Sequence, residues 1–327
     1  MMTGPQWLRA TGLVVPQNPT VSALLPGFDE RTVDVGGVRV HARTAGSGAP
    51  VLLLHGYPET LAMWHRVAPA LAERYAVVLA DLRGYGGSDK PRPGSGAAAY
   101  AKRAMALDQV RLMAALGHGR FAVVGHDRGG RVAHRMALDH RDRVSAVAVL
   151  DIVPTLHMYE HVDLAMATEY GHWFFLSRAD GLAERLIGAD PDAWFESRFR
   201  GRHAGADPFD PVALDEYRRA FRDPATIAAT CADYRAAATI DLEHDRADRD
   251  AGRRVTAPVL VLWGRESYVG RHFDPAGVWT SYATDVSGVA VAADHYIVEE
   301  APEDTIAALR AFLDRTVRAM STAGGEG

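Results

Sequence analysis

Short apolar runs separated by helical segments constrain the fold of this chain more than any other feature. Strands are expected at 38–42, 51–54, 76–80, 121–125, 145–150, 258–263 and 288–292. Most of these runs are apolar throughout, as in strands buried on both faces of a mainly parallel sheet. Helical periodicity marks 61–75, 101–117, 131–140 and 304–317. The alternation predicts an α/β fold with a doubly wound, mostly parallel sheet.

The alternation stops between residues 152 and 250. This segment is rich in aromatic residues, His and Arg, and it contains helical patches such as PDAWFESRF and PVALDEYRRAF without a clear strand. We interpret residues 152–250 as a helical cap inserted into a core that is formed by residues 1–151 and 251–327.

Composition excludes several classes of protein. The chain has 327 residues and a net charge of −5 without a block of Lys or Arg, which argues against nucleic acid or an anionic membrane as a partner. Cys231 is the only cysteine, so an intrachain disulfide is impossible. The sequence contains no run of about 18 apolar residues, so no transmembrane helix is expected. Residues 1–19 lack a signal-peptide pattern, so we expect a cytoplasmic protein.

The sequence GHDRGGR at 125–131 follows a predicted strand and precedes a predicted helix. A Gly-x-nucleophile-x-Gly pattern in this context indicates a nucleophile elbow, in which glycines permit a tight turn. Asp127 occupies the position of the nucleophile. The alternative is an ordinary helix N-cap aspartate.

Two further motifs support the elbow. The His-Gly turn in LLLHGYP (52–58) predicts an oxyanion hole made by the backbone N–H groups of Tyr57 and Arg128. His295 lies between the last predicted strand and the last helix, where a catalytic base is expected. Asp151, at the end of a strand, is the favoured acid to orient this histidine. Glu266, which follows the strand 258–263, is the alternative.

An aspartate nucleophile indicates which type of reaction the site catalyses. Attack by a carboxylate on a saturated carbon gives an alkyl ester, which water hydrolyses with His295 as general base. The leaving group is then a halide or an epoxide oxygen. Arg128 and Arg131 are three residues apart at a helix start, so they can share one face and bind a carboxylate. These residues together predict a small 2-haloacid as substrate.

Six segments carry a family resemblance: LLLHGYPET, DLRGYGGSDKP, GHDRGGR, VLDIVPT, HWFFL and HYIVEEAP. Together they resemble the fluoroacetate (haloacetate) dehalogenases of the α/β-hydrolase fold, over roughly residues 27–315. The resemblance implies Asp127 as nucleophile, His295 as base with Asp151, Arg128 and Arg131 as carboxylate ligands, and a halide pocket formed by His172, Trp173 and Tyr234.

The resemblance also implies hydrolysis of fluoroacetate or chloroacetate to a 2-hydroxyacid and halide, without metal or organic cofactor, by a possible homodimer. Two positions depart from the family pattern. Asp294 precedes the histidine where Gly is usual, and Tyr296-Ile297-Val298 replaces Phe-Leu-Pro. The residues leave the preferred halogen and chain length open.

Two other functions compete with a dehalogenase. An epoxide hydrolase would use the same Asp–His–acid set with two cap tyrosines, for which the candidates are Tyr159, Tyr170, Tyr217 and Tyr234. Against it, a neutral epoxide has no need of two arginines. A non-catalytic binder would be expected to lack the nucleophile or the histidine, and both are present.

Overall fold

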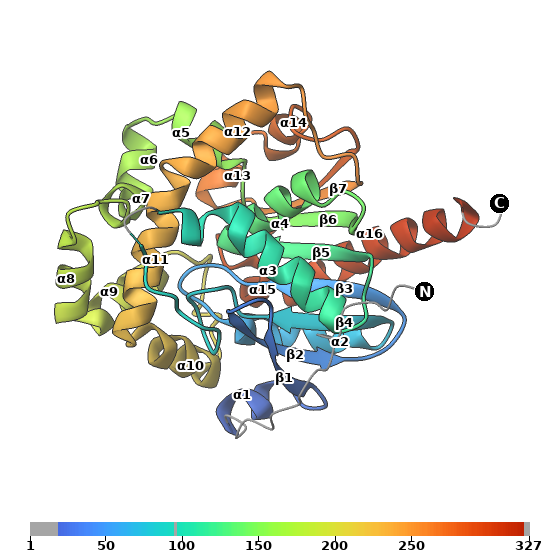
Figure 1. Ribbon diagram of the computed structural model, residues 1–327, viewed down its shortest axis with the longest axis horizontal. Coiled ribbons are helices and arrows are strands. Elements are labelled where there is room, and N and C mark those ends of the chain that lie inside the picture. The colour runs from blue at the N-terminus through green and yellow to red at the C-terminus, as the bar shows by residue number, and fades with distance from the viewer. Residues whose placement is uncertain (1–18, 95–96, 324–327) are drawn as a thin grey trace, which may run out of the picture.

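The computed structural model describes residues 19–94 and 97–323, which contain a sheet of eight strands (Figure 1). The strand order is β1-β2-β4-β3-β5-β6-β7-β8. All pairs from β4-β3 to β7-β8 are parallel, and β1-β2 and β2-β4 are antiparallel. The bounds are β1 Asp29–Asp34, β2 Arg39–Ala45, β3 Ala49–Leu54, β4 Tyr75–Ala80, β5 Phe121–His126, β6 Val144–Leu150, β7 Val259–Gly264 and β8 Val286–Val291. The predicted doubly wound α/β fold is confirmed.

The central strands are buried as their composition predicts. Every residue of β5 is buried, and six of the seven residues of β6 are buried. Edge strand β1, with the sequence DERTVD, is exposed or partly exposed throughout. We did not predict β1, because its polar sequence lacks the apolar signal of a buried strand.

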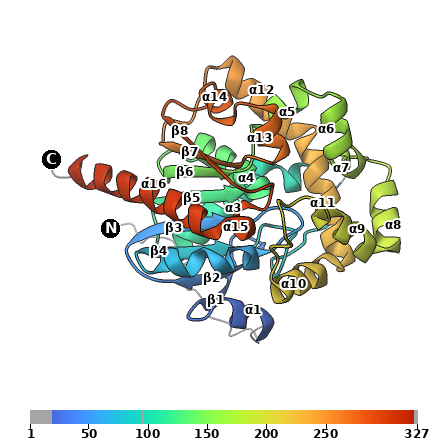
Figure 2. The ribbon, with the colours of Figure 1, turned by 180° about the vertical axis from the view of Figure 1, so that it is seen from behind.

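Helices cover both faces of the sheet. Helices α3 and α4 lie in front of it in Figure 1, and α2 and α16 lie in front of it in Figure 2, seen from behind. Their bounds are α2 Ala68–Ala72, α3 Lys102–Ala115, α4 Asp127–Asp139 and α16 Pro302–Ala323. Shorter helices are α1 Pro19–Leu24, η1 Leu61–Arg66, η2 Ala97–Tyr100, α13 Tyr268–His272, α14 Pro275–Trp279 and α15 Ile297–Glu300.

The prediction of one helix over 61–75 is wrong. The segment divides into the 3₁₀ helix η1 and the short helix α2, and Tyr75 already belongs to β4. Pro69 lies in the first turn of α2, where its missing N–H group is tolerated. Within a continuous helix the same proline would remove a hydrogen bond and clash with the preceding turn.

Between β6 and β7, all the regular structure is helical. Figure 1 shows most of these helices as a separate layer beside the sheet. They are α5 Thr155–Glu160, α6 Leu164–Glu169, α7 Gly171–Leu176, α8 Leu182–Ala189, α9 Pro191–Phe199, α10 Pro211–Phe221, α11 Pro224–Ala237 and α12 Ile240–Asp250. This arrangement is compatible with the proposed cap at 152–250, although the division into core and cap stays an interpretation. The predicted absence of a signal peptide concerns residues 1–19, nearly all of which lie outside the described residues.

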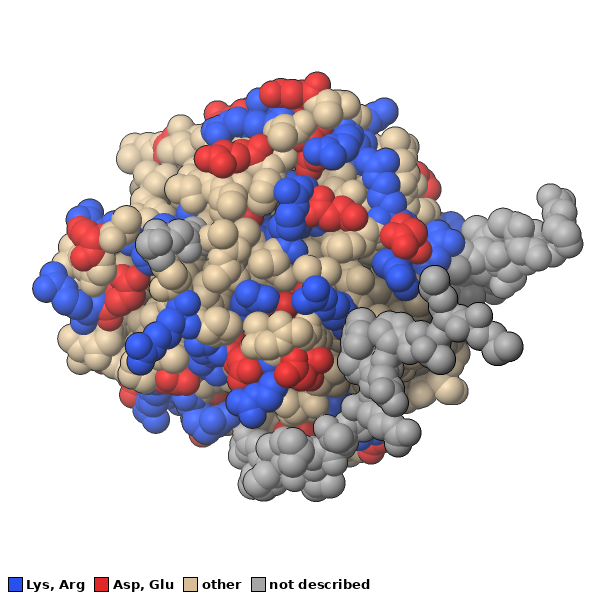
Figure 3. All heavy atoms as spheres, viewed as in Figure 1, with Lys and Arg blue, Asp and Glu red and all other residues tan. Residues whose placement is uncertain are grey.

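Two properties of the described residues bear on partners. None of their helices combines the length and the apolar character that spanning a membrane demands. On the face drawn in Figure 3, Lys and Arg are interspersed with Asp and Glu rather than gathered in one large patch.

Candidate active site

Asp127 lies at the junction of β5 and α4, at the carboxyl edge of the sheet. Its φ of 41° is in the left-handed region, which is strained for a residue other than glycine, and its side chain is buried. A Cβ atom on Gly125 would lie 2.3 Å from the carbonyl oxygen of Gly129, so only glycine permits strand and helix to approach this closely. The elbow predicted from GHDRGG is therefore present, although α4 begins at Asp127 itself rather than at residue 131.

The His-Gly turn after β3 lies against this elbow. The Tyr57 backbone N–H donates to Oδ2 of Asp127 at 3.2 Å. His55 Nε2 accepts from the Leu82 N–H at 3.0 Å, so its Nδ1 carries the proton and donates to the Gly56 carbonyl at 2.7 Å. These bonds fix the turn that positions the Tyr57 amide.

His295 is oriented by Asp151. Its Nδ1 lies 2.7 Å from Oδ2 of Asp151, whose other oxygen accepts from Ser267 Oγ at 2.7 Å and from the Gly264 N–H at 3.2 Å. A carboxylate partner at Nδ1 leaves Nε2 free to accept a proton. Glu266, the alternative acid, is exposed, so the structure brings Asp151 and not Glu266 to the histidine.

Charges around the two reacting groups favour an ionised nucleophile and a neutral base. Burial acts to raise the pKa of Asp127, but the positive charges of His295, when it is protonated, and of Arg131 and Arg128 outweigh it and lower that pKa below its usual range. Burial and the nearby Arg202 guanidinium lower the pKa of His295 well below its usual value. Burial also raises the pKa of Asp151 to about 7.

Arg128 is fully buried and is held by an aspartate that the sequence analysis did not identify. Its Nε and Nη2 donate to the two carboxylate oxygens of Asp233 at 2.8 and 2.7 Å, and Nη2 also donates to the Asp233 carbonyl at 3.0 Å. Tyr85 and Lys102 donate to the same carboxylate. Nη1 of Arg128 is buried without a partner among the described residues.

Arg131 presents a different pair of donors. Its Nη1 donates to the Val153 carbonyl at 3.1 Å and to Thr155 Oγ1 at 3.0 Å. Its Nε is buried without a partner in the described part of the chain. The Nε and Nη2 edge of a guanidinium matches a carboxylate bidentately. The two arginines thus offer different groups to a ligand: Arg131 offers its Nε and Nη2 edge, and Arg128 offers only Nη1.

The three predicted halide-pocket residues lie together. The ring of Tyr234 is 5.7 Å from that of His172 and 6.2 Å from that of Trp173. The Arg128 guanidinium lies 4.2 Å from the Tyr234 ring centre, and that of Arg131 lies 4.6 Å from the Trp173 ring centre. His172 Nδ1 is buried without a hydrogen-bond partner among the described residues. Burial, followed by the charges of Arg202 and Arg198, lowers the pKa of His172 well below its usual value.

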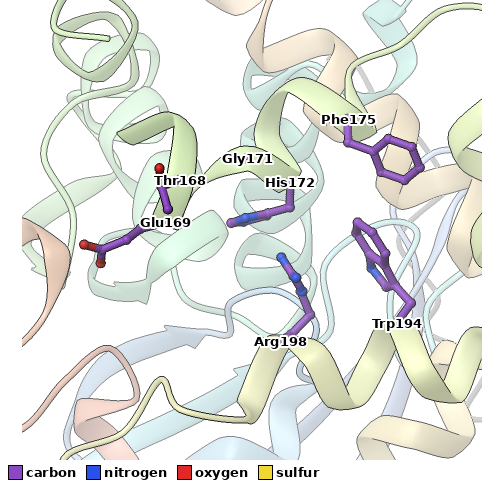
Figure 4. A pocket seen from close by; sticks show the side chains of 7 residues that line it. All are labelled: Thr168, Glu169, Gly171, His172, Phe175, Trp194 and Arg198. Carbon is purple, nitrogen blue, oxygen red and sulfur yellow. The ribbon is translucent and has the colours of Figure 1, made fainter. Parts of the chain in front are cut away.

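A surface pocket of about 310 Å³ reaches His172 (Figure 4). Arg198 and His172 point toward one another across it, and Trp194 lies beside them. Trp194 Nε1 donates to the Tyr57 hydroxyl at 2.6 Å. The pocket is lined by Thr168, Glu169, Gly171, His172, Phe175, Trp194 and Arg198.

A chain of buried polar groups behind His295 also escaped the sequence analysis. His126 Nε2 donates to the His295 carbonyl at 2.8 Å, so its Nδ1, 3.2 Å from Glu59, is the acceptor when the ring is neutral. Glu59 must then be protonated, and burial raises its pKa to about 8. Glu59 is hydrogen-bonded to Glu299, which accepts from Tyr217 OH at 3.0 Å. Glu59 and Glu299 lie in segments that the sequence analysis did use, but no spacing along the chain indicates that these two carboxyl groups meet in the fold.

Glu300 holds the backbone on both sides of the histidine. Its carboxylate accepts from the Asp294 N–H at 2.9 Å and from the Tyr296 N–H at 2.8 Å. The loop is therefore fixed with Asp294 in place of the expected glycine. No cluster of three or more His, Cys, Asp or Glu that could hold a metal occurs within residues 19–94 and 97–323.

The profile of the alpha/beta hydrolase fold family matches residues 49–302. The chain belongs to this family. A fluoroacetate dehalogenase of a Burkholderia species is 49% identical over 291 residues, which cover 89% of this chain and 95% of the relative. A soluble epoxide hydrolase of Corynebacterium sp. strain C12 is 34% identical over 276 residues, covering 83% and 92%.

A solved structure agrees with these sequence relatives. A protein of Nostoc sp. PCC 7120, provisionally described as an alpha/beta hydrolase, superposes with a TM-score of 0.86. It is 50% identical and covers 88% of this chain and 98% of its own. The predicted resemblance to fluoroacetate dehalogenases and the prediction of a hydrolase are confirmed.

Proposed function

We propose that the chain hydrolyses small 2-haloacids to 2-hydroxyacids and halide through an ester on Asp127. The observation that carries this proposal is the pair of unsatisfied arginine edges beside a buried aspartate nucleophile. A buried donor without a partner costs free energy, so such donors in a native protein call for a ligand. A carboxylate on the substrate would satisfy both arginines and place its α-carbon over the nucleophile.

In the first step, Asp127 displaces the halide. Its free carboxylate oxygen attacks the α-carbon while the carbon–halogen bond breaks, and the electron pair leaves with the halide. His172, Trp173 and Tyr234 supply N–H and O–H donors for the departing ion. His172 Nδ1 is buried without a hydrogen-bond partner among the described residues, which leaves it available for this role.

In the second step, water hydrolyses the ester. His295 Nε2 removes a proton from water, which attacks the carboxyl carbon of Asp127. The negative charge develops on Oδ2, the atom that the Tyr57 N–H already contacts. Collapse of this intermediate breaks the bond between the carboxyl carbon and the substrate oxygen, and the departing alkoxide takes the proton from His295 to give the 2-hydroxyacid. The new carboxyl group of Asp127 then loses its proton to solvent.

The test is a halide-release panel over fluoroacetate, chloroacetate, bromoacetate and 2-chloropropionate, combined with mass spectrometry of variants. His295→Asn should release halide once and then retain an added mass at Asp127, because the ester cannot be hydrolysed. A single turnover in ¹⁸O-water should label Asp127 and leave the first product unlabelled. Label in that first product would refute the covalent route.

An epoxide hydrolase is the second candidate, because a relative with this activity in its name is 34% identical over most of the chain. Tyr217 is committed to Glu299, which removes one of the tyrosines considered for epoxide opening. Formation of a diol from styrene oxide, without halide release from any haloacid, would favour this alternative.

We further propose a cytoplasmic homodimer. A lone buried cysteine suits a reducing compartment. Four large apolar side chains are exposed around the cap helices α6, α7 and α8: Val162, Leu164, Phe174 and Leu186. Light scattering coupled to gel filtration would test the dimer, and Leu164→Glu should yield monomers if these side chains form the interface. Fractionation of expressing cells would test the location.

A further inference from the structure

Two arginines beside the pocket have no carboxylate partner in the described part of the chain. Arg198 is the last but one residue of α9 and donates only to Ser197 Oγ, at 3.1 and 3.0 Å. The Arg202 guanidinium makes no hydrogen bond or ion pair to a described residue, and its nearest aromatic neighbour is the Tyr170 ring at 5.2 Å. Both side chains are partly buried.

This isolation is unusual for the cap. Most other arginines of α7–α12 and their loops pair with an acid, as Arg222 does with Asp192 and Arg235 with Glu184. An exposed cation without a partner is solvated by water. A partly buried cation loses some of that solvation, so an unpaired one at a pocket favours binding of an anion.

The acid that lines the pocket does not pair with either arginine. Glu169 lines the same pocket, but its carboxylate is 2.5 Å from Arg271 and 3.9 Å from His272. The charges of Arg198 and Arg202 instead act on His172, and that of Arg202 also acts on Asp127 and His295. Arg198 thus faces His172 in the pocket of Figure 4, and Arg202 lies 5.2 Å from the centre of the Tyr170 ring, which is itself 5.6 Å from the His172 ring.

We propose that Arg198 and Arg202 form an anion-receiving vestibule, in which a small monovalent anion is held between solvent and Asp127. The inference rests on the proposed function, in which both the substrate and the departing halide are small anions. The vestibule is separate from the Arg128 and Arg131 edges, since those arise from α4 in the core and these from α9 and the turn after it.

The test compares the double variant Arg198→Gln/Arg202→Gln with Arg200→Gln. Arg200 lies between the two arginines, but it is exposed and 3.9 Å from Glu196, so its loss removes one positive charge from the same turn without altering the vestibule. For chloroacetate, the double variant should lose about threefold to tenfold in kcat/KM and most of its dependence on ionic strength. For neutral chloroacetamide, kcat/KM should not change.

Halide inhibition separates the two sources of the anion. If incoming substrate is the main occupant, kcat for chloroacetate is retained and KM rises. If the departing halide is the main occupant, kcat falls and inhibition by bromide weakens. Equal losses for chloroacetate and chloroacetamide, or equal behaviour of Arg200→Gln, would overturn the proposal. The variant Arg198→Lys/Arg202→Lys keeps the charge and should restore most of kcat/KM, which guards against a folding defect.

A binding measurement separates this proposal from the proposed function. In an Asp127→Asn background, the Kd of chloroacetate is measured by calorimetry with and without the two Arg→Gln changes. If wild-type protein releases no halide from any haloacid, the proposed function fails, whereas weaker binding in the triple variant still supports the vestibule. An unchanged Kd together with unchanged salt dependence of kcat/KM rejects it.

Discussion

Replacing Asp233 with asparagine should destabilise the protein far more than the same change at Asp192. Each aspartate forms a bidentate pair with an arginine: Asp233 with Arg128 at 2.8 and 2.7 Å, and Asp192 with Arg222 at 2.7 and 2.6 Å. The first pair has no exposed side-chain surface, whereas 40% to 54% is exposed in the second. The comparison therefore contrasts a buried aspartate that also accepts from Tyr85 and Lys102 with an exposed aspartate that has one partner.

The magnitude follows from what Asp233→Asn leaves behind. Arg128 and Lys102 both donate to this carboxylate, so the change leaves two buried cations near Asp241 as the remaining acid. Breaking a buried ion pair by removing one partner costs about 3–5 kcal/mol. With about 2–4 °C per kcal/mol for a large domain, the melting temperature should fall by roughly 6 °C or more. Asp192→Asn should have little measurable effect, because water and salt screen an exposed pair.

Scanning calorimetry at neutral pH and two salt concentrations measures this difference, and steady-state kinetics on chloroacetate supplies a functional reading. Asp233→Asn should also raise KM for chloroacetate, because Arg128 is no longer held with Nη1 available to the substrate. A melting temperature for Asp233→Asn within error of that for Asp192→Asn would refute the reasoning. So would an effect on stability that is accompanied by unaltered KM.

Other predictions concern the buried acid, the base and the halide pocket. Burial raises the pKa of Glu59 to about 8, so this carboxyl group ionises at lower pH in the unfolded protein than in the folded one. The free energy of unfolding should therefore fall as the pH rises from the usual pKa of a glutamate toward 8. In urea titrations Glu59→Gln, whose amide can still donate to His126, should gain stability relative to wild type as pH rises, and Glu59→Ala should lose it at every pH. Because the pKa of His295 is lowered, kcat should stay constant as the pH falls past about 6.5, the usual pKa of histidine. A decline of kcat that already begins above pH 6.5 would contradict the assignment of His295 as the base. Tyr234→Phe should reduce halide release from fluoroacetate more than from bromoacetate, because fluoride needs hydrogen-bond donors most; equal losses would remove Tyr234 from this role.

Sequence patterns were informative where the relevant physics is local. The apolar runs identified the buried strands, and the glycines of GHDRGG identified the sharp turn at Asp127, since both depend on residues close in the chain. Pairing of Arg128 with Asp233 joins residues 105 positions apart, and nothing near either residue signals the partner. For the same reason, the predicted role of Arg128 as a carboxylate ligand takes no account of Asp233, which already binds two of its nitrogens.

The unpaired state of Arg202 was equally invisible. A sequence with 36 Lys and Arg and 41 Asp and Glu gives no indication of which cation lacks an anion. The helix expected at 61–75 failed for a different reason, because Pro69 fits the apolar periodicity of its neighbours while its ring stops the preceding turn.

Asp151 lies where the chain leaves β6 for the helical segment that follows it, and its hydrogen-bond partners lie where the chain returns to the sheet at β7. Its N–H donates to Leu262 at 2.8 Å, and its carboxylate accepts from Gly264 and Ser267 just beyond β7. The residue that orients His295 therefore also joins the two ends of this helical segment by hydrogen bonds. The contacts that orient His295 thus lie outside residues 152–250, so substitutions within that segment can change what the site accepts without removing them.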